Sequence, residues 1–73
     1  MSASQKHRHV FGQTLRMLRQ QSGLSQEALA EKADLSAVFI SRVERGKESP
    51  SLDSIVKISK AFGIRVRVLV ADI

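Results

Sequence analysis

The sequence predicts a single small domain built from short α-helices. Apolar residues recur at helical spacing in four separate stretches of the 73-residue chain. Serine stands just before three of these stretches, where a helix N-cap belongs, and glycine follows three of them, where helices commonly end. A chain of this length is near the lower limit for a domain with its own hydrophobic core.

The first predicted helix runs from about His9 to Ser22. Phe11, Leu15 and Leu18 lie on one face of it, at positions i, i+4 and i+7. Residues 1–8 lack this periodicity and carry basic side chains. We therefore interpret residues 1–8 as a flexible basic arm that precedes a domain of residues 9–73.

Two short helices are predicted next, over residues 26–33 and 37–45. Ser25 and Ser36 are their expected N-caps. Two helices joined by so short a connector have the spacing of a helix-turn-helix. Ala30 is small enough for the helices to cross closely, and Asp34 occupies the turn. The expected inward residues are Leu29, Ala30, Ala33, Ile40 and Val43.

A fourth helix is expected to begin after Ser51 and to extend to about Phe62. Its expected inward residues are Leu52, Ile55, Ile58 or Ser59, and Phe62. Residues 64–73 fit two patterns. Their β-branched residues alternate as in a strand, whereas Ile64, Val68 and Ala71 lie at helical spacing. The pattern alone slightly favours a strand.

The charge balance favours a polyanionic partner. Twelve Lys and Arg residues stand against seven Asp and Glu, which gives a formal net charge of +5. Such an excess on a small domain points first to nucleic acid. The chain has no cysteine, only two histidines and no glycine-rich phosphate loop, so we expect no enzyme activity, no metal site and no other cofactor.

Apolar runs in the sequence are short. The longest, Val68 to Ala71, is far below the length of a membrane span, and the N-terminus lacks the apolar segment of a secretory signal. We expect no membrane association, a location in the cytoplasm and association with the nucleoid.

A longer motif surrounds the two central helices. It comprises Gly23-Leu24-Ser25-Gln26-Glu27-Ala28-Leu29-Ala30, Leu35-Ser36, Ile40-Ser41-Arg42-Val43-Glu44-Arg45-Gly46-Lys47 and Pro50-Ser51-Leu52. In this motif the chain resembles the lambda-repressor-like helix-turn-helix family. That family includes phage repressors, restriction–modification controller proteins and several antitoxins. The resemblance covers roughly residues 11–73. It implies a compact bundle of about five helices that binds operator DNA, usually as a two-fold dimer.

The same resemblance bears on the end of the chain. It favours a short fifth helix within residues 64–73, although Arg67 and Val68 replace the polar, capping start that the family usually has there. Some antitoxins of the family end instead in a strand shared between two subunits, so a strand stays the alternative.

The resemblance also implies roles for individual residues. Ala37, Val38, Ser41 and Arg42 match positions that face base edges. An arginine there can bind O6 and N7 of guanine, and apolar side chains can pack on thymine methyl groups. The expected phosphate contacts are Gln26, Ser36, Arg45 and Lys47, of which Ser36 matches the cap of the recognition helix. Arg19 and Glu44 match a partly buried ion pair between the first and third helices.

Two further residues, in the helix-turn-helix itself, depart from the family pattern. Asp34 replaces the commoner glycine of the turn, although aspartate tolerates left-handed backbone better than most residues. Ala37 is apolar where some phage repressors carry glutamine, so a bidentate contact to adenine is not expected there.

Apolar residues near the end of the chain exceed what a monomer of this size is expected to hide. We interpret Val66, Val68, Leu69 and Val70 as a dimer surface. The predicted function is a sequence-specific transcriptional regulator, such as a repressor. A homodimer would bind a pseudo-palindromic operator of double-stranded DNA, with residues 37–45 in the major groove.

Such a regulator would act by blocking or recruiting polymerase. The alternative is an antitoxin-type protein that binds a toxin partner and regulates its own expression through DNA binding.

Overall fold

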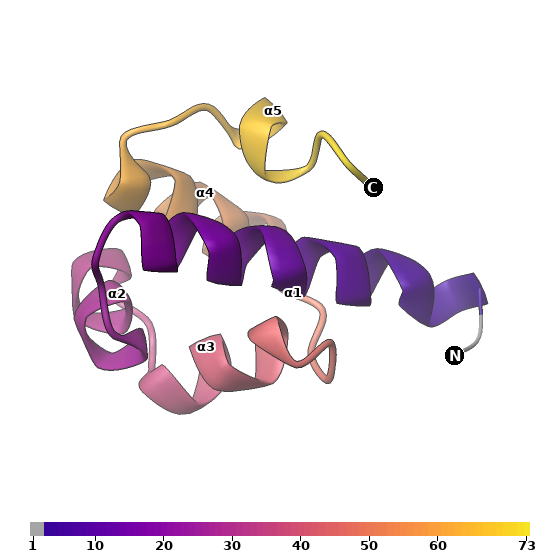
Figure 1. The fold of residues 1–73 in the computed structure, drawn as a ribbon, viewed down its shortest axis with the longest axis horizontal. Helices are drawn as coiled ribbons and strands as arrows, with labels where there is room; N and C mark the ends of the chain where they lie inside the picture. Colours follow the sequence, from indigo (N-terminus) through magenta and orange to yellow (C-terminus); the bar gives the residue numbers. More distant parts are fainter. Residues whose placement is uncertain (1–2) are drawn as a thin grey trace.

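A long first helix lies at the centre of the fold, and four shorter helices surround it (Figure 1). The structure is a computed structural model that describes residues 3–73. The helices are α1 (Ala3–Gln21), α2 (Gln26–Ala33), α3 (Ala37–Glu44), α4 (Leu52–Phe62) and α5 (Val66–Leu69). Helices α3 and α5 both contact α1, from opposite sides of it in Figure 1. The all-α prediction is confirmed, since residues 3–73 contain no strand.

Serine side chains start the three middle helices, as predicted. The hydroxyl oxygens of Ser25, Ser36 and Ser51 accept hydrogen bonds from backbone N–H groups three residues on, at 3.0, 3.0 and 3.1 Å. Each bond satisfies a donor that has no partner within its own helix. The bounds of α2 and α4 agree with the prediction, and α3 ends at Glu44, one residue earlier than expected.

The first helix begins earlier than the sequence pattern indicated. It starts at Ala3 instead of about His9, so the part of the expected arm that the structure describes, residues 3–8, is helical. Residues 1–2 of that arm lie outside the described residues. No Gly or Pro occurs in residues 3–8, and most of them have good or moderate helix propensity. Amphipathic spacing marks only the part of a helix that packs on the core.

A tight left-handed turn joins α2 to α3. Asp34 has φ 56° and ψ 48°, and it is the one residue other than glycine with positive φ in the described chain. The N–H of Leu35 donates to the carbonyl oxygen of Ala30 at 2.9 Å, which closes the turn. Asp34 therefore adopts the backbone expected for the glycine that it replaces.

The chain ends in a short helix, and the strand alternative is wrong. Helix α5 has no side-chain hydrogen bond at its N-cap residue, Arg65. It is held instead by Leu69, which is 1% exposed and belongs to the core. The strand pattern placed Leu69 opposite the valines, whereas the helical turn directs it inward.

The core lies between α1 and the helices around it. Its buried apolar residues are Phe11, Leu15, Leu29, Ala30, Ala33, Ile40, Val43, Ile58 and Leu69. Leu52, predicted to face inward, is 70% exposed because it is the first residue of α4 and lies at the edge of the packed face. None of the helices in residues 3–73 is both long and apolar enough to cross a membrane.

Gly12 allows α1 and α3 to approach closely. A Cβ atom on Gly12 would lie 2.7 Å from the carbonyl oxygen of Glu44, and closer still to that of Val43. The backbone of α3 thus packs directly against the backbone of α1 at this residue. Glycine at this position fixes the distance between the central helix and α3.

Candidate nucleic-acid interface

Helix α3 turns one row of side chains to the core and leaves the opposite rows uncovered. Ile40 and Val43 are fully buried. On the outer side, Val38 is 70% exposed and the Arg42 side chain 47%, one helical turn apart. Ala37 and Ser41, on the adjacent row, are partly buried. An exposed row that pairs an apolar side chain with a guanidinium has the chemistry to contact base edges in a major groove.

An ion pair attaches α3 to α1 beneath this surface. The Arg19 Nε donates to Glu44 Oε2 at 2.6 Å, and Nη2 donates to Oε1 at 3.1 Å. The remaining guanidinium nitrogen of Arg19, Nη1, donates to the carbonyl oxygen of Leu24 at 2.8 Å. Only 12% of the Arg19 side chain and 3% of the Glu44 side chain are exposed. The hydrogen bonds that Arg19 donates to Glu44 raise the pKa of Arg19, although burial opposes this shift.

The same carboxylate also holds the first residue of α2. The Gln26 amide nitrogen donates to Glu44 Oε1 at 3.0 Å. Glu44 therefore connects α1, α2 and α3 through two side chains. Gln26 is expected from the sequence to contact only the DNA backbone, so its bond to Glu44 is a new observation. It could not be read from the sequence because the two residues are 18 positions apart and lie on different helices.

The side chains expected to contact phosphate lie around the exposed rows of α3. A shallow hollow between the start of α2 and α3 is lined by Gln26, Glu27, Ala37, Val38, Ser41 and Arg45. Ser36, before α3, and Lys47, after it, are both exposed. The structure thus brings Gln26, Ala37, Val38, Ser41 and Arg45 to one concave surface, with Arg42 on the adjoining row.

Helix α1 contributes polar and cationic side chains beside this surface. His9, Gln13, Arg16, Met17 and Gln20 line a second hollow together with Glu44 and Arg45. Arg16 has no predicted role in the sequence. Its position on the outer face of α1, beside Arg45, extends the basic surface away from the start of α2.

Glu48 is another residue without a predicted role. Its Oε1 lies 3.2 Å from the Arg42 Nε, and both side chains are close to half exposed. The contact joins the last turn of α3 to the loop that follows. Helical spacing could not reveal it, because the loop does not continue the helix.

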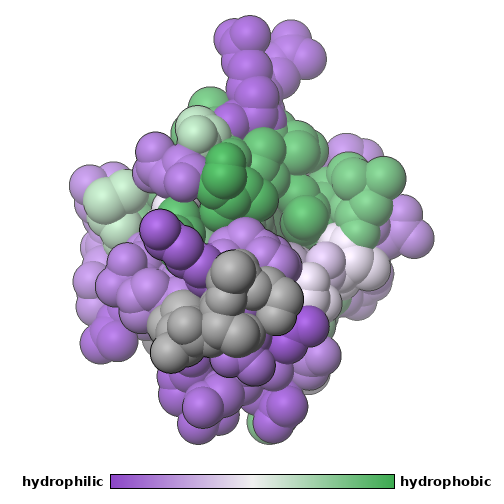
Figure 2. Space-filling model, turned by 90° about the vertical axis from the view of Figure 1, so that its right-hand side faces the viewer, coloured by the Kyte–Doolittle hydropathy of each residue, from purple (hydrophilic) through white to green (hydrophobic). Residues whose placement is uncertain are grey.

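A different surface carries most of the large apolar side chains that are exposed within residues 3–73. Figure 2 shows apolar residues gathered on the face where both chain ends lie. Ile73 lines hollows there with Val10, Phe11 and Ile55. Of the predicted dimer residues, Val68 is 45% exposed and Val66 and Val70 are partly buried. Leu69 is the exception: its burial in the core removes it from any dimer surface.

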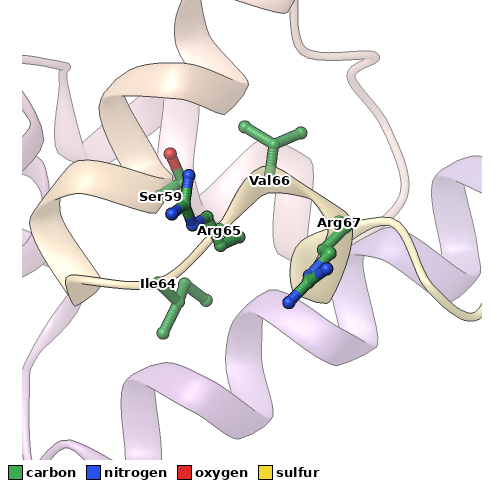
Figure 3. Close-up of a pocket in the computed structure, with 5 residues that line it drawn as sticks. All are labelled: Ser59, Ile64, Arg65, Val66 and Arg67. Atoms are coloured by element: carbon green, nitrogen blue, oxygen red, sulfur yellow. The ribbon is translucent and has the colours of Figure 1, made fainter.

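A further hollow lies between the end of α4 and α5 (Figure 3). Ser59, Ile64, Arg65, Val66 and Arg67 line it. Figure 1 places α5 across α1 from α3, so this hollow is not part of the surface that α3 presents. The Ser59 hydroxyl donates to the carbonyl oxygen of Val56 at 2.8 Å. Within residues 3–73, no three His, Cys, Asp or Glu side chains are placed to hold a metal ion.

Known proteins share both the sequence pattern and the arrangement of these helices. The family model described as helix-turn-helix matches residues 15–69. The control protein C.BamHI of Bacillus amyloliquefaciens is 49% identical over 59 residues, which are 80% of this chain and 73% of the relative. The immunity repressor protein of Bacillus phage phi105 is 36% identical over 63 residues, which are 86% of this chain and 44% of the repressor.

A solved structure is similar over nearly its whole length. The crystal structure of the restriction-modification controller protein C.AhdI from Aeromonas hydrophila superimposes with a TM-score of 0.83. It is 44% identical to this chain and is matched over 94% of its length, against 85% of this chain.

Proposed function

This chain belongs to the helix-turn-helix family, and from that premise we propose that it binds an inverted-repeat operator as a homodimer. The family and its relatives are transcriptional regulators, so the chain is a DNA-binding regulator and not an enzyme. The proposal assigns α3 to the major groove. It also assigns residues to base contacts and to phosphate contacts, and it places the surface through which two copies associate.

The exposed row of α3 carries this proposal. Val38 is 70% exposed, so its apolar side chain is free to pack against a base edge in the groove. We assign Val38 and Ala37 to apolar contacts with base edges, and Arg42 to the O6 and N7 atoms of a guanine. Ser41, on the row next to Arg42, is assigned to the same set of bases.

Phosphate contacts are assigned to the residues around that row. Arg45 and Lys47 supply positive charge at the end of α3, and Ser36 lies at its start. Gln26 opens α2, where the helix N-terminus favours an anion. Its second amide hydrogen remains for a phosphate when the first is bound to Glu44. These contacts supply affinity and orientation but little sequence information.

The dimer is assigned to the side of the molecule formed by α4, α5 and the chain end. Three of the five large apolar side chains that are exposed within residues 3–73 belong to these elements: Leu52, Val68 and Ile73. Val66 and Val70 border them and are partly buried. A two-fold dimer through this surface would present two α3 helices to DNA about 34 Å apart, one helical turn.

The relatives suggest which genes are regulated. C.BamHI is named a control protein, and C.AhdI is named a restriction-modification controller protein. We therefore propose that this chain controls restriction–modification genes. We also propose that it acts in the cytoplasm, where it associates with the nucleoid. The reported relatives are named as control proteins and a repressor, and these names do not support the antitoxin alternative.

Two substitutions test the assignment of base and phosphate contacts. On duplexes that the wild-type protein selects from a random pool, Arg42→Ala should lose discrimination at one base pair per half-site, about 5- to 150-fold. Lys47→Ala should weaken binding to all sequences alike and reduce the slope of log K against log salt by about one unit. The assignment is wrong if both variants lose affinity equally on every sequence.

A further inference from the structure

The loop after α3 holds a carboxylate against the proposed base-reading arginine. Glu48 Oε1 lies 3.2 Å from Arg42 Nε, with 40% of the Glu48 side chain and 47% of the Arg42 side chain exposed. Both groups lie next to the surface assigned to DNA. An acidic residue at this place is unexpected, because a carboxylate repels the phosphates that the surrounding cations attract.

The backbone fixes this contact. The N–H of Gly46 donates to the carbonyl oxygen of Val43 at 3.0 Å, and the N–H of Lys47 donates to that of Arg42 at 2.9 Å. Gly46 has φ +72°, so the chain reverses direction directly after α3. Glu48 is thereby returned to the last turn of the helix, beside Arg42.

The contact uses only one edge of the guanidinium. Glu48 accepts from Nε, and the two terminal nitrogens of Arg42 have no hydrogen bond to any residue that the structure describes. A guanine edge offers two acceptors, N7 and O6, to a pair of parallel donors. The terminal pair can bind both while Nε stays on Glu48. The carboxylate also makes it unfavourable for Arg42 to turn toward a phosphate.

We propose that Glu48 is a positioning residue that holds Arg42 toward the base edges and so sets the sequence selectivity of the protein. The inference rests on the proposed function, in which Arg42 reads a base. It assigns to Glu48 no direct contact with DNA. Glu48 lowers affinity for DNA in general and raises the preference for one base pair.

The experiment compares three proteins by fluorescence anisotropy at fixed salt: wild type, Glu48→Ala and Glu48→Gln. The probes are the selected duplex, the same duplex with the base pair identified by Arg42→Ala replaced, and an unrelated duplex. Glu48→Ala should lower discrimination at that base pair by up to about fivefold, the upper end of the range for an exposed ion pair. It should also bind the unrelated duplex more tightly. Glu48→Gln should bind the unrelated duplex more tightly too but keep most of the discrimination, because it retains an acceptor oxygen.

Two controls separate positioning from charge and from folding. Glu31→Ala removes an exposed carboxylate of α2 that forms no ion pair within the described residues, so discrimination should not change. In an Arg42→Ala background, Glu48→Ala should have no further effect on discrimination. Thermal unfolding of each variant shows whether it is folded.

The outcomes distinguish this inference from the proposed function. If Arg42→Ala loses no base preference, the proposed role of Arg42 fails, and that of Glu48 fails with it. If Arg42→Ala loses a preference that Glu48→Ala keeps, only the positioning role is overturned. An equal loss from Glu48→Ala with and without Arg42 would mean that Glu48 contacts the base itself, which also overturns the proposal.

Discussion

Glu44 supports the surface that is proposed to contact DNA, although its own side chain is almost fully buried. Its two oxygens accept hydrogen bonds from Arg19 on α1 and Gln26 on α2, which fixes both helices relative to α3. The pKa of Arg19 is raised above its ordinary value. The ion pair therefore stabilises the fold fully at any pH below the ordinary pKa of arginine. This stabilisation is lost only as the pH rises through the raised pKa that Arg19 has in the folded protein.

Replacement of Glu44 should strongly destabilise the protein. Glu44→Gln keeps the shape of the side chain but leaves the Arg19 charge buried without a counter-ion, at a cost of about 3–5 kcal/mol. Urea unfolding should show this loss as a lower midpoint with an unchanged slope. Exposed Glu31→Gln is the control and should stay within about 0.5 kcal/mol of wild type. A loss below about 1 kcal/mol for Glu44→Gln would contradict a supporting role for this pair.

Helices α1 and α3 pack backbone against backbone at Gly12. Helix propensity alone predicts that alanine at this position stabilises α1 by about 1 kcal/mol. The backbone carbonyl groups of Val43 and Glu44 occupy the space that the new methyl group would need. Because backbone yields less readily than a flexible side chain, we expect the steric cost to exceed the gain.

Gly12→Ala should therefore lower the melting temperature by about 4 °C or more, since 1 kcal/mol corresponds to about 4–8 °C in a domain of this size. Gln13→Ala, at the next and exposed position of α1, should leave it unchanged or raise it slightly. Calorimetry of both variants checks the prediction. A higher melting temperature for Gly12→Ala would mean that the two helices can separate without loss of packing.

Local signals made most helix positions predictable. Ser25, Ser36 and Ser51 mark helix starts because a cap depends only on the next three residues. The start of α1 at Ala3 has no such signal, since its first turns lie beyond the amphipathic part of the helix. Contacts across a loop or between helices were equally hidden: Gly12 against α3, Gln26 on Glu44, and Glu48 on Arg42.

The end of the chain shows how a small change in geometry alters a predicted surface. The surplus of apolar residues near the end of the chain led us to predict one dimer surface that included the valines and Leu69. The single turn of α5 turns these side chains to different sides of the helix. Leu69 points into the core, whereas Val68 is 45% exposed. Leu52, expected in the core, is exposed because it begins α4.

Two copies of the molecule are proposed to associate through the apolar surface of α4, α5 and the chain end. Val68→Asp should dissociate the dimer, shown by sedimentation velocity as a shift from two chains to one, with the helical content retained. Met17→Asp is a matched control, because Met17 is 48% exposed but lies on α1. Dissociation by Met17→Asp with a stable Val68→Asp dimer would place the interface on another surface.

Selection of bound duplexes from a random DNA pool, at near-physiological salt, is the measurement to make first. The salt must be fixed because phosphate contacts depend on it steeply. A dimer that reads sequence through α3 should enrich an inverted repeat whose half-site centres lie about one helical turn apart. Retention of the pool without enrichment of any sequence would show that charge alone drives binding, and would contradict sequence-specific regulation by this chain acting by itself.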